Sequence, residues 1–170
     1  MKAAKASLRA RALQCLAQRE HSRAELRRKL LSHVHADAAS EADDAGAAAQ
    51  VDAALDWLEA NKYLSPERFV ESRVHARAAR FGNLRIHQEL AQHDLALSPD
   101  AAQALRSNEL ERARAVWSRK FSAGPASAAE RGKQMRFLAG RGFSAELIGQ
   151  LMRELSDREG EAFKSAAPED

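Results

Sequence analysis

The apolar positions of this chain recur every three or four residues, in short segments separated by polar caps, glycines or prolines. Leu8, Ala12 and Leu16 show this spacing near the start of the chain, and Leu26 and Leu30 show it again after a polar break. Such a period is typical of amphipathic helices, whereas strands alternate with a period of two. The pattern therefore predicts helices along most of the chain.

Polar residues mark where the helices are expected to begin. A Ser or Asn before an apolar segment caps free N–H groups, a Glu three residues later completes a capping box, and Pro fits the first turn. The predicted starts are Ser22 with Glu25, Ser65 with Pro66, Ser98 with Pro99, Asn108 with Glu111, Ser127 with Glu130, and Ser144. Turn glycines at Gly82, Gly124, Gly140 and Gly142 separate successive helices.

The helices group into repeats. The segments that begin at Ser98 and at Ser144 share a capping Ser, an acid two positions later and a Leu seven positions later. We predict an all-α protein, an elongated and curved array of three tandem three-helix repeats that resemble helix-turn-helix units. The predicted repeats are residues 1–64, with an acidic Ala-rich insertion at about 36–50, then 65–106 and 107–156, followed by a flexible tail at 157–170. Stacked repeats usually bind partners along a face.

Composition supports the all-helical prediction, because aromatic residues make up only 5% of the chain. The single Cys15 cannot form an internal disulfide, and the first residues do not look like an export signal, so we expect a cytoplasmic protein. No apolar run approaches the roughly 20 residues of a spanning helix, so no membrane association is expected.

Charge alternates in blocks along the chain. Residues 1–31 carry nine Lys or Arg and two acids, a net charge of +7, whereas residues 32–61 carry seven acids and no Lys or Arg, a net charge of −7. Residues 111–155 are basic again, and the last fifteen residues are acidic. This alternation favours a polyanion or an acidic protein as partner, with solvated helix surfaces as the alternative.

Candidate chemistry is sparse. His33, His35 and Asp37 are the one local cluster of metal-ligand types, and their spacing is poor for a helix, so neither a metal nor another cofactor is predicted. Cys15 has no basic neighbour to activate it, and no phosphate-binding loop is recognisable, so an enzyme is the least favoured reading. The aromatic residues Trp57, Tyr63, Trp117 and Phe143 are interpreted as core rather than as base-stacking platforms.

Arginines that recur three or four residues apart are the best candidates for partner contacts, because such spacing places them on one helix face. They would contact phosphates or carboxylates without reading base sequence. The candidate contact residues are Arg23, Arg27, Arg28, Arg73, Arg77, Arg85, Arg136 and Arg141. The apolar residues Leu26, Leu30, Phe69, Ile86, Leu90, Phe137 and Phe143 are assigned to the core.

An ordered set of short strings resembles the RecX family of regulatory proteins. The strings are Arg19-Glu-His-Ser22, Glu25-Leu26 with Lys29-Leu30, Tyr63-Leu64 with Arg68-Phe69 and Arg73, Gly82 with Arg85-Ile86 and Glu89-Leu90, Lys120-Phe121, and Arg136-Phe137-Leu138 with Arg141-Gly142-Phe143. The chain departs from the family pattern at Ser65-Pro66, at Asp94 near a usual turn glycine, and in its longer acidic insertion.

The resemblance implies a fold of three-helix repeats and a function that composition does not show. Members of the family bind the RecA filament on single-stranded DNA and restrain its ATPase, strand-exchange and co-protease activities. The implied partners are the RecA filament and single-stranded DNA, with double-stranded DNA as a further candidate, and the chain is expected to be a monomer without a cofactor. The alternative is an autonomous DNA-binding protein with little sequence preference.

Overall fold

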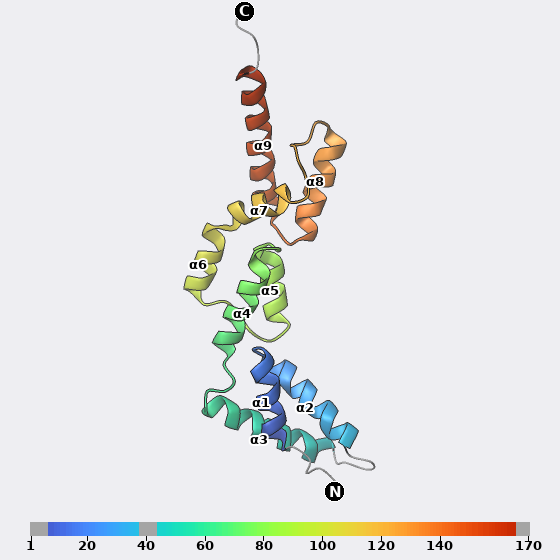
Figure 1. The fold of residues 1–170 in the computed structure, drawn as a ribbon, viewed down its shortest axis with the longest axis vertical. Coiled ribbons are helices and arrows are strands. Elements are labelled where there is room, and N and C mark those ends of the chain that lie inside the picture. The colour runs from blue at the N-terminus through green and yellow to red at the C-terminus, as the bar shows by residue number, and fades with distance from the viewer. Residues whose placement is uncertain (1–6, 38–43, 166–170) are drawn as a thin grey trace, which may run out of the picture. The chain divides into compact units, whose positions relative to one another are not determined.

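The computed structural model describes residues 7–37 and 44–165, and within these residues the regular elements are nine α-helices, with no strand. They are α1 (Leu8–Gln18), α2 (Arg23–Asp37), α3 (Asp44–Ala60), α4 (Pro66–Ala78), α5 (Asn83–Ala91), α6 (Pro99–Ser107), α7 (Glu109–Ser118), α8 (Ala128–Gly140) and α9 (Ala145–Ser165) (Figure 1). The prediction of an all-α chain is confirmed.

Serine caps begin most of the helices where the sequence predicts them. The Ser22 hydroxyl accepts the N–H of Glu25 at 3.1 Å, and Ser65, Ser98, Ser127 and Ser144 each accept an N–H three residues later at 3.2 Å. Each hydroxyl satisfies one N–H that has no partner within its helix.

The capping box predicted at Asn108 is wrong. Asn108 lies between α6 and α7 and makes no side-chain cap; its Oδ1 accepts a hydrogen bond from Arg112 Nε at 2.8 Å instead. The Asn108 oxygen, predicted to accept a backbone N–H of α7, thus accepts a hydrogen bond from the Arg112 guanidinium.

Helical structure extends into the predicted insertion and into the predicted tail. Helix α3 begins at Asp44, inside the insertion predicted at 36–50, and α9 continues to Ser165, beyond the predicted end near Ser156. Both stretches are rich in strong helix formers, Ala in the first and Arg, Glu and Lys in the second, and helix propensity prevails where apolar periodicity fades. The remaining residues of the predicted insertion and tail, 38–43 and 166–170, lie outside the described residues.

The chain separates into two compact units, and the first consists of residues 1–72 with residues 92–95. Its helices α1, α2 and α3 pack around one apolar cluster in which Leu26, Leu30 and Leu55 are fully buried. Tyr63 corrects a prediction: it is 48% exposed and stacks on Trp57 with ring centroids 5.6 Å apart. A tyrosine in the turn after α3 has one ring face on its neighbour and the other side in solvent.

The second unit consists of residues 73–91 and 96–170. Helices α7, α8 and α9 supply its main core, in which Trp117, Leu138 and Phe143 are buried. Phe137, predicted to be core, is only partly buried: it packs against this cluster and meets Phe121 edge to face at 5.4 Å. Leu138 takes the buried position, and the adjacent residue on a helix points about 100° away.

The boundaries of the three repeats stay a prediction, since this division into two units cuts through α4 and the second repeat.

Two glycine turns interlock within the second unit. The N–H of Gly82, after α4, donates to the carbonyl of Arg141 at 2.9 Å, and the N–H of Leu84 donates to the carbonyl of Gly142 at 3.1 Å. A Cβ on Gly82 would lie 2.3 Å from the carbonyl oxygen of Gly142, and Gly142 itself has a φ of +84°. Only glycine at both positions allows the two backbones to approach this closely.

Arg112 on α7 links the turn after α4 to α5 and α6 through hydrogen bonds of its side chain. Its guanidinium donates to the carbonyls of Ala78, Phe81 and Leu105 at 3.0 to 3.1 Å, and to Oδ1 of Asn83. Burial lowers the pKa of Arg112, and nearby Glu109 opposes this effect. Carbonyls at the end of α4 thus receive the hydrogen bonds that the helix itself cannot supply.

Candidate partner interface

Two of the predicted contact arginines on α2 pair with carboxylates of α3. Arg23 donates to Asp56 at 2.7 Å and to Glu59 at 2.8 Å, while Arg27 forms a two-bond pair with Asp52 at 2.8 and 3.1 Å. The hydrogen bond from Arg27 lowers the pKa of the Asp52 carboxyl. The basic first block of the chain and the acidic block after it therefore partly neutralise each other inside one unit.

Arg28 lies next to these pairs on α2 and is exposed, as is Lys29. In the second unit, Arg136 is exposed on α8. Arg73 is half-buried in α4. Arg28 belongs to the first unit, whereas Arg73 and Arg136 belong to the second.

The other three predicted arginines gather around one aromatic ring. The guanidinium carbons of Arg77, Arg85 and Arg141 lie 5.5, 4.6 and 5.7 Å from the centroid of Phe81, and that of Arg80 lies at 5.8 Å. We call these five residues the Phe81 cluster. They come from α4, from the turn after it, from α5 and from the turn after α8, so the glycine interlock places them together. A cation over a ring face is attracted by the ring quadrupole.

A single carboxylate balances part of this charge. Glu89 accepts from Arg77 at 2.8 Å and lies 3.5 Å from Arg85. Among the described residues, Arg80 and Arg141 have no carboxylate within ion-pair distance, and Arg141 donates to the carbonyl of Arg80 at 3.4 Å. The Phe81 cluster therefore keeps a net positive charge on the surface.

The eight candidate contact residues do not include Arg80 or Phe81, although helical spacing places Arg80 on the same predicted face as Arg73 and Arg77. The signal was present, because Arg80-Phe81-Gly82 puts a cation and an aromatic residue directly before a turn glycine. Helical spacing does not find the whole group, since Arg80, Phe81 and Arg141 lie outside the helices.

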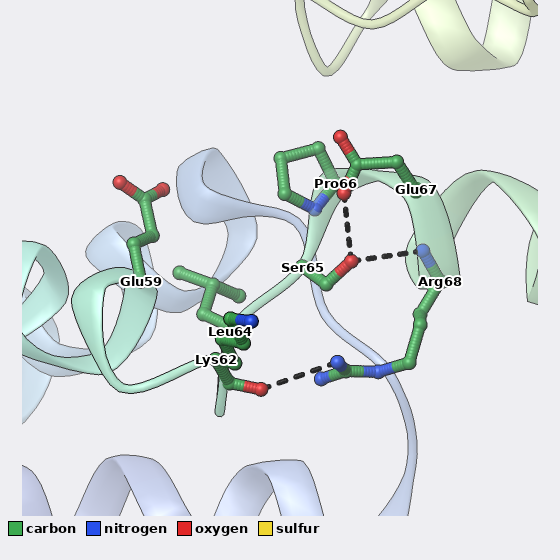
Figure 2. A pocket seen from close by; sticks show the side chains of 7 residues that line it. All are labelled: Glu59, Lys62, Leu64, Ser65, Pro66, Glu67 and Arg68. Atoms are coloured by element: carbon green, nitrogen blue, oxygen red, sulfur yellow. Dashed lines mark hydrogen bonds between the residues drawn. The ribbon is translucent and has the colours of Figure 1, made fainter.

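A hollow of about 460 Å³ lies where α3 leads into α4 in the first unit (Figure 2). The Ser65 hydroxyl accepts the N–H of Arg68 at 3.2 Å and donates to the Glu67 carboxylate at 2.8 Å, and the Arg68 guanidinium donates to the Lys62 carbonyl. Backbone and Ser65 hydrogen bonds lower the pKa of the Glu67 carboxyl. These polar groups satisfy one another, which is what a helix start requires.

Ser22, His93 and Glu25 have the residue types of a hydrolytic triad, but not its geometry. Ser22 Oγ lies 3.0 Å from His93 Nδ1, whose other ring nitrogen is 3.7 Å from Glu25. Ser22 is only 1% exposed, and its oxygen already caps α2. A nucleophile must reach its substrate, so this group is a buried structural network.

No helix within the described residues is long and apolar enough to cross a bilayer. The same part of the chain contains no group of three or more His, Cys, Asp or Glu side chains arranged to hold a metal ion.

The fold and the surface define a class of protein: an array of helical repeats with surface arginine clusters, a scaffold that suits binding to another macromolecule. The comparisons identify the family. A model described as the third three-helix domain of RecX matches residues 107–152. The regulatory protein RecX of Ralstonia nicotianae is 49% identical over 86% of this chain and 87% of its own length. The chain therefore belongs to the RecX family.

Other RecX proteins also match this chain in sequence along most of its length. The regulatory protein RecX of Leptothrix cholodnii is 48% identical over 90% of this chain and 91% of its own, and that of Herbaspirillum seropedicae is 51% identical over 86% and 90%. The crystal structure of RecX from Lactobacillus salivarius superposes with a TM-score of 0.63 over 88% of this chain and 94% of that one, at 19% identity. The likeness confirms the helical repeat fold.

Proposed function

We propose that this protein binds the RecA filament on single-stranded DNA and restrains its ATPase, strand-exchange and co-protease activities. The relatives that match along its length are named regulatory proteins, which supports a regulatory role rather than an enzymatic one. The single observation that carries the proposal within this chain is the Phe81 cluster, a charged surface group without a neighbouring catalytic arrangement in the described residues. We propose further that the protein acts as a monomer in the cytoplasm.

The eight arginines predicted as contacts remain our proposed interface residues, and their pairing ranks them. Arg141 in the Phe81 cluster and the exposed Arg28 and Arg136 are the strongest candidates, and Arg85, whose pair with Glu89 is a longer one of 3.5 Å, comes next. Arg23 and Arg27 are weaker ones, because a partner would have to displace the carboxylates that they already bind.

A second candidate function is DNA binding without RecA and without sequence preference. The clustered arginines favour it, since such groups neutralise phosphates in any sequence. The same charge serves both functions, so an experiment must separate binding to the filament from binding to its DNA.

The test is ATP hydrolysis by the RecA protein of the same organism on a fixed amount of single-stranded DNA, with this protein titrated in. Inhibition at amounts well below that of RecA, unchanged when DNA is added in excess, is the expected result for filament binding. Inhibition that disappears in excess DNA would establish the second candidate function. A variant with Arg106→Gln, an exposed arginine of α6 outside the proposed contacts, is the control.

A further inference from the structure

A second hollow, of about 250 Å³, lies in the second unit beside the Phe81 cluster. Four of the residues that line it are cations: Arg80, Arg119, Lys120 and Arg141. No acidic residue lines it, and the rest of its wall comes from Ala79, Val116 and Phe137. Arg119 and Lys120 belong to none of the contacts considered above.

The four cations are held in place without being neutralised by carboxylates. Arg119 donates to the carbonyl of Ala79 at 3.0 Å, and Arg141 donates to that of Arg80 at 3.4 Å. Lys120 Nζ lies 5.7 Å from the centroid of Phe137, and the Arg141 guanidinium lies 5.1 Å from the same ring. Within the described part of the chain, none of the four has an ion-pair partner.

The negative ends of nearby helices balance part, but not all, of the positive charge of the four cations. Helices α4, α7 and α8 end at Ala78, Ser118 and Gly140, and the four cations follow these ends by one or two residues. Each C-terminus carries roughly half a negative charge, so three of them supply about 1.5 charges against four positive side chains. An excess of roughly two to three positive charges remains for a ligand.

The shape and chemistry of the hollow favour a nucleic-acid backbone over an acidic protein. A protein interface usually has an apolar core with large side chains in it. The exposed large hydrophobic residues among those described are Tyr63 and Leu84, and neither lines this hollow. Several cations around a small space match a nucleic-acid strand, whose backbone carries one negative charge on every nucleotide.

We propose that this hollow binds backbone phosphates of single-stranded DNA, with Arg80, Arg119, Lys120 and Arg141 as the ligands. The site reads no base sequence, since its contacts are to phosphate. The choice of single-stranded DNA rests on the proposed function, in which the filament is built on that strand. The protein would thus touch the DNA directly as well as the filament.

The test compares two double variants of the full chain that remove equal charge. Arg119→Gln with Lys120→Gln changes the hollow, whereas Arg106→Gln with Arg153→Gln changes exposed positions of α6 and α9 outside it. Binding to a fluorescent oligothymidylate, in the absence of RecA, is measured by anisotropy over a range of salt concentrations. Circular dichroism and thermal unfolding verify that both variants fold.

Two lost phosphate contacts should reduce the slope of log affinity against log salt by about 1.4 for the hollow variant, and the control variant should keep the wild-type slope. Equal slopes for the hollow variant and the wild type would overturn the proposal. So would a hollow variant that keeps its DNA affinity but inhibits RecA less, because the hollow would then bind an acidic protein surface. The anisotropy measurement contains no RecA, so it tests DNA binding by the hollow even if the protein turns out not to inhibit RecA.

Discussion

Leu30 and Arg27 lie three residues apart on α2 and have opposite surroundings. Leu30 is fully buried among the side chains of α1 and α3, whereas the Arg27 side chain is 41% exposed. Leu30→Ala should lower the free energy of unfolding by about 2–5 kcal/mol, because it removes buried methyl groups and leaves a cavity. Arg27→Ala should leave it nearly unchanged, because the exposed pair with Asp52 is screened by solvent. Urea unfolding followed by circular dichroism measures both.

The comparison within one helix controls for helix propensity, since both changes introduce Ala at interior positions of α2. A large loss on Arg27→Ala would mean that the pair with Asp52 holds α2 and α3 together. The assignment of this arginine to the binding surface would then be wrong.

His21 makes stability depend on pH. It is 1% exposed, and burial, reinforced by the positive charges of Arg19 and Lys29, lowers its pKa; Glu25, with Oε2 3.1 Å from Nδ1, acts in the opposite direction. The unfolded chain then binds a proton more readily than the folded one. The contribution of the neutral ring is complete above a pH of about 6.5 and is lost as the pH falls below that value toward the folded pKa.

The measurement is the free energy of unfolding at several pH values between neutrality and mild acid. Wild-type protein should lose stability over this interval more steeply than His21→Asn, whose amide can still donate to Glu25 but does not titrate. Parallel curves for the two proteins would show that His21 does not control the pH dependence.

At the scale of elements, the interlocked glycine turns decide whether α5 and the turn after α8 stay together. Gly82→Ala places a methyl group 2.3 Å from the carbonyl oxygen of Gly142, so the two backbones must separate. We expect a loss of at least about 1–3 kcal/mol in the free energy of unfolding, the usual cost of overpacking. Gly140→Ala is the matched control, because a Cβ there meets no atom within 4 Å.

The Gly140→Ala variant should be as stable as the wild type or up to about 1 kcal/mol more stable, since Ala is the better helix former. Denaturant unfolding of both variants checks the pair. Equal stability of Gly82→Ala and the wild type would mean that the turns can separate without cost, and the Phe81 cluster would not depend on them.

The local signals of the sequence predicted the elements well. Serine caps and apolar periodicity gave the starts of α2, α4, α6, α8 and α9, and most of the assigned core residues are buried. The errors lie at Asn108, whose oxygen accepts a hydrogen bond from Arg112 four residues later, and at Phe137 and Tyr63, which keep an exposed side. Arg112 itself is held by the carbonyls of the distant residues Ala78 and Phe81. No pattern within one helix reveals which residue of a distant turn will meet it.

At the scale of the whole molecule, charge blocks along the sequence do not map directly onto charged surfaces. The first two blocks, of +7 and −7, meet in one unit through the pairs of Arg23 and Arg27 with acids of α3. The basic residues around Phe81 come from separate elements of the second unit, where Glu89 balances them only in part. The sequence therefore predicted a basic binding surface, but which arginines keep their charge available depends on the fold.

This difference leads to a prediction about the regulatory function. Arg80→Gln with Arg85→Gln should raise the concentration that half-inhibits RecA ATP hydrolysis by roughly tenfold, which corresponds to about 1.4 kcal/mol of binding free energy. Arg23→Gln with Arg27→Gln removes equal charge, but from side chains already bound to Asp56, Glu59 and Asp52, so it should shift that concentration far less.

The two double variants are compared in the same titration, after circular dichroism has verified their folds. Equal effects would mean that the filament displaces the carboxylates of α3, and that total charge decides binding rather than its pairing. A larger effect of the α2 variant would move the interface to the first unit. The expected order follows from the cost of breaking an existing ion pair. A partner must break short pairs of 2.7 to 2.8 Å at Arg23 and Arg27, but only the longer 3.5 Å pair with Glu89 at Arg85 and, among the described residues, none at Arg80.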